Sequence, residues 1–130
     1  MPRLPFDFEY QADQWERDEP ISLSDLVAKS AVLKLFEGLG IYGDVVDLGC
    51  GEGFISRQLA AFAKKVVGVD ISEGMIARAQ TVQKLRRQAI AYVRGDITAM
   101  PFFKSACFDI GVSVFVTNYL PLSSLHGFYA

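Results

Sequence analysis

Four stretches of the chain are dominated by apolar residues, and polar or glycine-rich segments separate them. These stretches are residues 44–48, 65–71, 89–93 and 108–116. Their length and their content of β-branched residues are typical of strands. A nearly all-apolar strand such as 44–48 is typical of a parallel sheet, in which both faces of the strand are buried. The pattern therefore predicts four strands, most of them parallel.

Apolar residues recur at helical spacing in the segments that precede and join these strands. The predicted helices are residues 22–39, from 54 to about 63, and from 72 onward. Ser22 with Asp25 resembles a capping box, and Gly40 is suited to end the first helix. Ser72 followed by Glu73 is a good start for the last one. Each connection between strands is thus long enough to hold a helix.

This alternation predicts an α/β fold with a doubly wound, mostly parallel Rossmann-like sheet and helices on both faces. We divide the chain into an N-terminal arm, residues 1–21, and one domain, residues 22–130. The arm is acidic but rich in aromatic residues, including Tyr10 and Trp15. These rings are expected to fix the arm to the core. In the alternative interpretation the arm is a lid, and Tyr10 and Trp15 cover a ligand.

Length and charge limit the function classes. The chain has 130 residues, enough for one core, and a net charge of −2, which gives no electrostatic footprint for nucleic acid or for an anionic membrane. The N-terminus lacks the apolar core of a signal peptide, and no apolar run is long enough to span a bilayer. The two cysteines, Cys50 and Cys107, match no zinc spacing. We expect a cytoplasmic protein without a metal.

The candidate chemistry begins at residues 45–53, where a strand passes through a glycine-rich turn into a helix. The glycines are Gly49, Gly51 and Gly53, whereas a dinucleotide fingerprint requires its third glycine at the position of Phe54. Asp47 precedes the turn, and its carboxylate would repel a pyrophosphate in a partly buried site. The turn therefore favours a cationic ligand over a phosphate.

Two further acids follow the next two predicted strands. Asp70 ends the second strand, where a carboxylate can accept hydrogen bonds from the vicinal hydroxyls of a ribose. Asp96 lies in the loop after the third strand, where it can accept from an exocyclic amine while Ile97 offers its backbone to the same base. With Asp47, three acids at the carboxyl ends of parallel strands are expected to converge on one crevice.

Four motifs in order along the chain resemble the class I S-adenosylmethionine-dependent methyltransferases. They are Val45–Gly53, Val67–Ser72 with Met75, Gly95–Ile97 with Met100–Phe102, and Phe108–Ile110. The resemblance covers about residues 40–120. It implies S-adenosyl-L-methionine as cofactor and S-adenosyl-L-homocysteine as product.

The resemblance also implies a role for each motif residue in binding the cofactor. Asp47 and the turn of Gly49, Cys50, Gly51 and Gly53 would hold the methionine part, and Asp70 the ribose. The adenine ring would be lined by Ile71 and Met75, and its edge would contact Asp96 and Ile97. Cys50 is more simply interpreted as a small apolar residue than as a nucleophile.

The reaction implied is an in-line methyl transfer to a small molecule, in which most of the protein's task is alignment and exclusion of water. Asn118 stands where many small-molecule members have histidine, so it either positions the substrate or ends the strand. It is not followed by Pro-Pro-Tyr, which argues against nucleic-acid bases and protein glutamine as acceptors. The sequence identifies neither the acceptor atom nor a catalytic base.

The chain departs from the family in length. Full members have seven strands, whereas four are predicted here, so the fourth strand would leave an apolar edge. A second copy in a homo-oligomer or a missing C-terminal segment could cover this edge. The alternative function is a truncated, non-catalytic cofactor-binding or interaction module that pairs through the open edge. A nicotinamide-dependent Rossmann enzyme is a third interpretation, and Asp47 and Phe54 argue against it.

Overall fold

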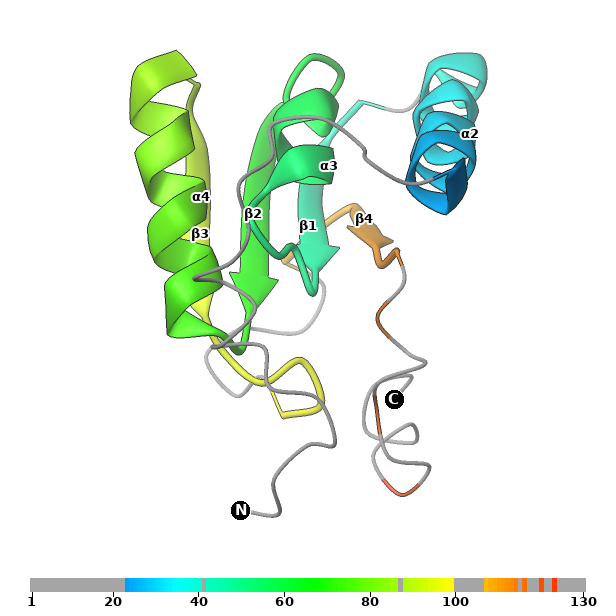
Figure 1. The fold of residues 1–130 in the computed structure, drawn as a ribbon. Coiled ribbons are helices and arrows are strands. Elements are labelled where there is room, and N and C mark those ends of the chain that lie inside the picture. Colours follow the sequence, from blue (N-terminus) through cyan, green and yellow to red (C-terminus); the bar gives the residue numbers. More distant parts are fainter. Residues whose placement is uncertain are drawn as a thin grey trace.

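The computed structural model describes residues 23–40, 42–86, 88–99, 107–114, 116, 120 and 123. Helices and strands alternate along these residues (Figure 1). In chain order the elements are α2 (Leu23–Leu39), β1 (Asp44–Leu48), α3 (Phe54–Leu59), β2 (Lys65–Asp70), α4 (Glu73–Arg86), β3 (Ile90–Arg94) and β4 (Ile110–Val112). Tyr10, Trp15 and Asn118 lie outside the described residues, so what the sequence predicts of them stays a prediction.

The strands form one sheet in the order β3-β2-β1-β4, and every pairing is parallel. The chain moves outward from β1 through β2 to β3 and then returns to the other side of β1 for β4. In open parallel sheets ligands bind outside the carboxyl ends of the strands, at the point where the order reverses. Here that point lies between β1 and β4. The predicted Rossmann-like fold with four parallel strands is confirmed.

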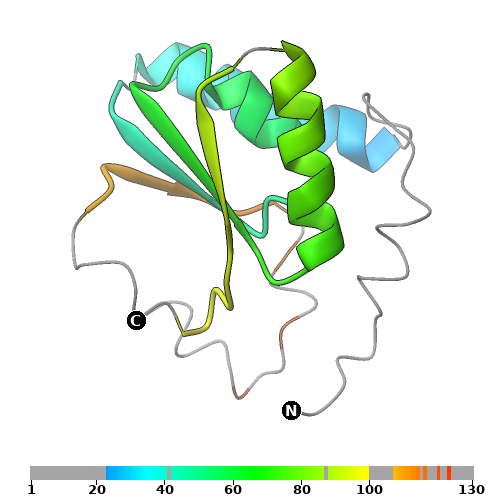
Figure 2. The same cartoon turned by 90° about the vertical axis from the view of Figure 1, so that its left-hand side faces the viewer.

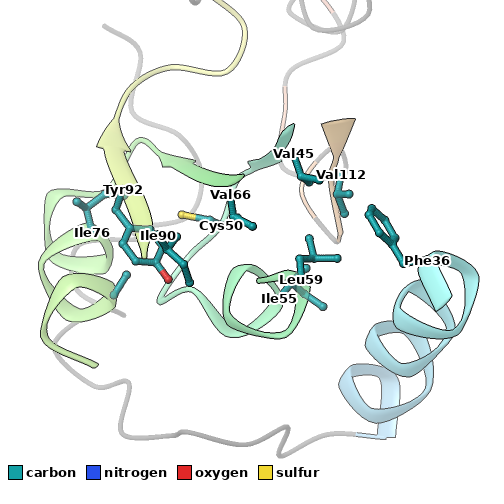
Figure 3. Close-up of a cluster of buried hydrophobic side chains, with 11 residues drawn as sticks. Phe36, Val45, Cys50, Ile55, Leu59, Val66, Ile76, Ile90, Tyr92 and Val112 are labelled. Carbon is teal, nitrogen blue, oxygen red and sulfur yellow. The ribbon is translucent and has the colours of Figure 1, made fainter. Parts of the chain in front are cut away.

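Helices α2, α3 and α4 lie against the same face of the sheet (Figure 2). One hydrophobic cluster joins all three helices to all four strands on this first face (Figure 3). Its buried members are Phe36, Val45, Cys50, Ile55, Leu59, Val66, Ile76, Ala79, Ile90, Tyr92 and Val112. The strand residues among them alternate with neighbours that face the other way, as the period of two in a strand requires.

The second face of the sheet carries its own cluster, built from Val46, Val67, Val69 and Ile97. Phe108, which precedes β4, packs against this cluster. Both described ends of the connection between β3 and β4 therefore lie on the second face.

Helix α3 ends at Leu59, earlier than the predicted end near Ala63. The N–H groups of Phe62 and Ala63 both donate to the carbonyl of Leu59 at 2.9 Å and close a turn. The next N–H, of Lys64, donates to the carbonyl of Gly43 at 2.8 Å, just before β1. Because this bond fixes where β2 starts beside β1, the chain leaves the helix early.

Strand β4 is also shorter than the predicted 108–116, and it lies at the edge of the sheet with its ladder to β1 running from Ile110 to Val112. Asp109 pairs at the start of this strand. Its Oδ2 accepts the N–H of Asp44 at 2.8 Å, and its own N–H donates to the carbonyl of Asp44 at 2.9 Å. The other predicted strand ends differ from those observed by one residue, which is within the usual variation of such boundaries.

Helix α2 forms as predicted, and Gly40, with φ of 59°, follows its last residue. It contacts the first face through Phe36, which is buried, with Val32 and Leu33 packed beside it. Val27 and Leu35 point to solvent with 60% and 59% of their surface exposed. The helix therefore has apolar residues on its outer side as well. No helix formed by the described residues is both long and apolar enough to cross a bilayer.

Burial predicts how leucines of two different helices contribute to stability. Leu59 of α3 is 0% exposed and Leu85 of α4 is 80% exposed. We expect Leu59→Ala to lower the free energy of unfolding by about 2–5 kcal/mol, because it removes buried surface and leaves a cavity. Leu85→Ala is the matched control and should change it by no more than about 0.5 kcal/mol. Urea unfolding followed by circular dichroism measures both, and equal losses would contradict the placement of α3 in the core.

Candidate cofactor site

The glycine loop, residues 49–53, joins the carboxyl end of β1 to the start of α3. Gly49, Gly51 and Gly53 have φ angles of 76°, 56° and 88°, in the left-handed region that side chains with a Cβ rarely adopt. A Cβ added at Gly51 would meet nothing within 4 Å, so the surface of the loop is open at that residue. The glycines thus let the backbone turn sharply, and Gly51 leaves room for a ligand to lie directly on the loop.

Four amides of the glycine loop are already bonded inside the protein. The N–H groups of Gly49 and Cys50 both donate to the carbonyl of Val69, at 2.8 and 2.9 Å. The N–H of Gly53 donates to the carbonyl of Cys50 at 3.0 Å, and that of Gly51 to Oδ2 of Asp70 at 2.9 Å. A phosphate-binding loop instead turns its amides toward the ligand. These four are unsuited to a phosphate, in agreement with the sequence prediction.

Asp47 is buried in β1, with 3% of its surface exposed. Its Oδ2 accepts a hydrogen bond of 2.6 Å from the hydroxyl of Ser56, which lies in the first turn of α3 and is fully buried. A buried carboxylate needs such partners, because an unbonded charge away from water is costly. Ser56 therefore fixes the orientation of Asp47 at the base of the loop.

Asp70 connects the end of β2 to the glycine loop. Its Oδ1 accepts the N–H of Ser72 at 2.9 Å, and its Oδ2 accepts the N–H of Gly51. Because each carboxylate oxygen can accept more than one hydrogen bond, the pair can also receive hydroxyl donors from a ligand. The bond to Gly51 brings the second predicted acid to the loop that follows the first, as expected.

The pKa of the Cys50 thiol depends on the charges around the loop. Burial raises the pKa of its thiol well above the usual range, and the carboxylates of Asp47 and Asp70 raise it further. Glu52 acts in the same direction to a smaller extent. The carboxylates of Asp47 and Asp70 thus place a negative potential on the loop, which favours a cationic group there, whereas Glu52 is paired with Arg57. The raised pKa supports the interpretation of Cys50 as an inert apolar residue.

The predicted adenine residues lie around the ends of β2 and β3. Ile71 is half-buried, and its carbonyl accepts a bond of 3.1 Å from Nε of Arg94. Met75 is buried in the first turn of α4, where its N–H donates to the hydroxyl of Ser72 at 3.1 Å. The predicted start of this helix at Ser72 is thereby confirmed.

Asp96 and Ile97 follow β3, as predicted. The Oδ1 of Asp96 accepts the N–H of Thr98 at 2.9 Å and its hydroxyl at 2.6 Å, so this oxygen holds the turn of its own loop. Ile97 is buried in the cluster of the second face. Asp96 thus has a structural role, and its contact with an adenine edge stays a prediction.

The segment after β4 approaches the glycine loop. A Cβ added at Gly49 would collide with the side chain of Val116, so the two residues are in close contact. Val116 precedes the predicted substrate residue Asn118 by two positions. Asn118 itself lies outside the described residues, and its role stays a prediction.

Four residues that hold the glycine loop and Asp47 in place were missed by sequence reasoning. They are Ser56, Glu52, Arg57 and Tyr92. The available signals were the pairing of an acid with an arginine five positions on, and an aromatic residue in a strand adjacent to one that contains a glycine. Neither signal is specific, because the same residue types occur on exposed helices and strands.

Glu52 and Arg57 form an ion pair that is almost completely buried. Nη2 of Arg57 donates to Oε2 of Glu52 at 2.8 Å, and Nη1 donates to the backbone carbonyl of Glu52 at 2.6 Å. The two side chains are 4% and 2% exposed, with Glu52 given first. Removing one partner of such a pair usually costs about 3–5 kcal/mol, because the other charge stays buried.

Tyr92 of β3 packs against the glycine loop from the buried first face of the sheet. A Cβ added at Gly53 would collide with the Tyr92 ring and hydroxyl, and one added at Gly68 would come within 2.7 Å of the ring. Figure 3 shows the Tyr92 ring among the buried residues of the first face. Burial raises the pKa of its hydroxyl, and the nearby charge of Arg57 opposes this effect. Gly68 and Gly53 therefore make room for a ring that fills the space under the loop.

The described residues show no metal site, and their recess lies away from the glycine loop. Among the described residues, no group of three or more metal-ligating side chains could hold a metal ion. A recess of about 270 Å³ is lined by residues that include Ala60, Lys64 and Ala89, at the start of β2 and β3. It lies at the opposite end of the sheet from the glycine loop. The carboxyl ends of the strands, and not this recess, carry the converging acids.

Comparisons with known proteins agree with this geometry. The sequence profile of the methyltransferase domain family matches residues 45–130. The malonyl-[acyl-carrier protein] O-methyltransferase of Legionella pneumophila is 34% identical over 126 residues, which are 92% of this chain and 40% of that protein. The chain therefore spans less than half the length of this relative.

Solved structures share the fold. PH0226 protein from Pyrococcus horikoshii aligns with 95% of this chain and 58% of its own, with a TM-score of 0.79 and 26% identity. The DhpI–SAM–HEP complex aligns with 94% of this chain and 54% of its own, with a TM-score of 0.73 and 22% identity. The chain belongs to the class I S-adenosylmethionine-dependent methyltransferase family. The cofactor of this family is S-adenosylmethionine.

The environment of Cys50 predicts how the two cysteines react. We expect iodoacetamide to modify Cys107, which is exposed, at least about tenfold faster than Cys50, because burial and a raised pKa suppress the Cys50 thiolate. Mass spectrometry of the folded chain at mildly alkaline pH measures both rates, and urea-unfolded chain serves as the control in which both should react. Equal rates in the folded chain would contradict the packing of Cys50 under the loop.

Proposed function

We propose that this protein is a methyltransferase that binds S-adenosylmethionine at the glycine loop and transfers its methyl group to a small molecule. The observation that carries the proposal is the hydrogen bond from the N–H of Gly51 in the loop to the carboxylate of Asp70. Asp47 is buried at the base of the same loop. This arrangement brings two acids of separate strands to one open glycine surface at the switch point of the sheet.

The chemistry of these groups fits the cofactor. S-adenosylmethionine carries an ammonium, a sulfonium and a ribose diol, and it carries no phosphate. A loop with internally bonded amides and surrounding carboxylates suits the cationic groups, whereas a dinucleotide would place a pyrophosphate beside Asp47. The same observations argue against the nicotinamide-dependent interpretation.

Each part of the site has a proposed task. Asp47 and residues 49–53 would hold the methionine end. Asp70 would accept hydrogen bonds from both ribose hydroxyls. Ile71 and Met75 would line the adenine, and Asp96 and Ile97 would contact its edge. Ser56 and Ser72 would keep the two main carboxylates in place, through the bonds already described.

The protein's contribution to the reaction would be alignment. Bound S-adenosylmethionine supplies a methyl group on a sulfonium, which is already strongly electrophilic. The glycine loop and Asp70 would fix its two ends, so that the acceptor atom can approach in line with the methyl–sulfur bond. Tyr10, Trp15 and Asn118 are proposed to contact the acceptor or cover the site, and no residue is assigned as a general base.

The acceptor is proposed only as a class. The Legionella pneumophila relative is named for O-methylation of a malonyl group on acyl-carrier protein. Malonyl thioesters therefore belong in the panel of acceptors for an assay, beside other small carboxylates, phenols and amines. A location in the cytoplasm stays a prediction of the sequence.

A second candidate function is supported by the edge of the sheet. Strand β4 has three residues and ends the strand order, and Ile110 and Val112 on it are apolar. Such an edge can pair with another strand. The chain would then be a cofactor-binding module without turnover, whose partner is a second copy or a further segment of a longer chain.

Substitution of Asp70 tests the proposed function. We expect the 130-residue chain to bind S-adenosylhomocysteine in calorimetric titration, and Asp70→Ala to weaken binding at least about a hundredfold, because two hydrogen bonds to a charged group are lost. Glu37→Ala, which removes an exposed acid of α2, is the matched control and should bind as the unaltered chain does.

A methyl-transfer assay over the acceptor panel accompanies the titration. Binding with turnover supports the methyltransferase, and binding without turnover on the whole panel favours the cofactor-binding module. Retained affinity in Asp70→Ala would overturn the ribose assignment. Failure of the unaltered chain to bind would overturn the proposed function.

A further inference from the structure

A buried ion pair joins Glu52 of the glycine loop to Arg57 of α3, yet the proposed function assigns the pair no task. Buried ion pairs bring little net stability, since replacing both partners by uncharged residues of similar size is often neutral. This pair has an additional feature. Its arginine also grips the backbone, because Nη1 donates to the carbonyl of Glu52 at 2.6 Å.

The glycine loop is fixed at two ends by different groups. Its β1 end is held by two residues of β2, because the amides of Gly49 and Cys50 donate to the carbonyl of Val69 and that of Gly51 to Asp70. Its α3 end is held by the guanidinium of Arg57, which bonds the carbonyl of Glu52, while the backbone N–H of Arg57 makes the first bond of the helix to the carbonyl of Gly53 at 2.9 Å. The guanidinium therefore orients the peptide group between Glu52 and Gly53.

The space behind the loop leaves this arrangement little freedom. The Tyr92 ring lies against Gly53, and neither Glu52 nor Arg57 has more than a few per cent of its surface in water. The guanidinium is planar and presents its donors as a rigid fork. Because the fork holds a carboxylate and a carbonyl of the same residue, it fixes both the side chain and the backbone of Glu52.

We propose that Arg57, through its ion pair with Glu52, is a positioning residue that sets the α3 half of the glycine loop for the amino-acid end of the cofactor. Asp70, which is bonded to the other half of the loop through the N–H of Gly51, serves the nucleoside end. This inference rests on the proposed function, since it assumes that the ligand lies across the loop. Loosening the α3 half of the loop should then lower the affinity for ligands that have an amino-acid end and leave the affinity for ligands without one unchanged.

Two ligands distinguish binding of the amino-acid end from binding of the nucleoside end. S-adenosylhomocysteine has the amino-acid end, and methylthioadenosine has the same nucleoside and thioether without it. The variant is the double substitution Glu52→Gln with Arg57→Met, which removes both charges together and therefore leaves neither one unpaired in the interior. Thermal unfolding establishes that each variant is folded before calorimetric titration with both ligands.

We expect the double variant to bind S-adenosylhomocysteine about tenfold more weakly and methylthioadenosine within about twofold of the unaltered chain, because the lost hydrogen bonds involve a charged donor. Arg57→Lys keeps the charge but not the fork, so it should give a smaller loss with the same preference. Arg86→Met, at the exposed end of α4, is the matched control and should leave both affinities unchanged.

The outcomes distinguish this inference from the proposed function. If the unaltered chain binds both ligands and the variants lose affinity for both equally, Arg57 has only a structural role and the inference fails alone. If the double variant does not unfold cooperatively, Arg57→Lys decides in the same way. If the unaltered chain binds neither ligand, the proposed function fails, and the inference fails with it.

Discussion

The bond from the Gly51 amide to the Asp70 carboxylate is the constraint on which the rest of the site depends. It joins the loop after β1 to the end of β2, and it is reinforced by two amides of the loop that donate to the carbonyl of Val69. Because β1 and β2 are adjacent and parallel, these groups meet only at the carboxyl edge of the sheet. The strand order thus determines the local arrangement of charge, in which carboxylates lie on two sides of the glycine loop.

Concentrating carboxylates at this edge requires compensation inside the protein. Asp47 obtains it from the hydroxyl of Ser56, Asp70 from backbone amides, and Glu52 from the guanidinium of Arg57. The three partners are chemically different, and the two that act through side chains, Ser56 and Arg57, both belong to α3. The same charges raise the pKa of the Cys50 thiol, which keeps this sulfur neutral under the loop. A cationic ligand would complete the balance of charge from the outside.

Much of this could be predicted from the sequence, because strand ends and turns are encoded locally. The apolar run before Asp47 and the glycines after it indicate a strand and a sharp turn, and Asp70 follows the next apolar run in the same way. The end of α3 at Leu59 could not be predicted, since it depends on a bond between Lys64 and Gly43 that forms only when β2 lies beside β1. The contacts of Arg57 and Tyr92 with the loop likewise depend on tertiary packing.

Amide NMR spectra of the isotope-labelled chain, recorded during titration with S-adenosylhomocysteine, test the central claim most directly, because they locate the ligand residue by residue. The account predicts that the signals of residues 49–53 and of Asp70, Ile71 and Ser72 shift together and saturate, while NAD leaves them unchanged. Shifts confined to the recess near Ala60 and Ala89 at the other end of the sheet, or a response of the loop to NAD alone, would contradict it.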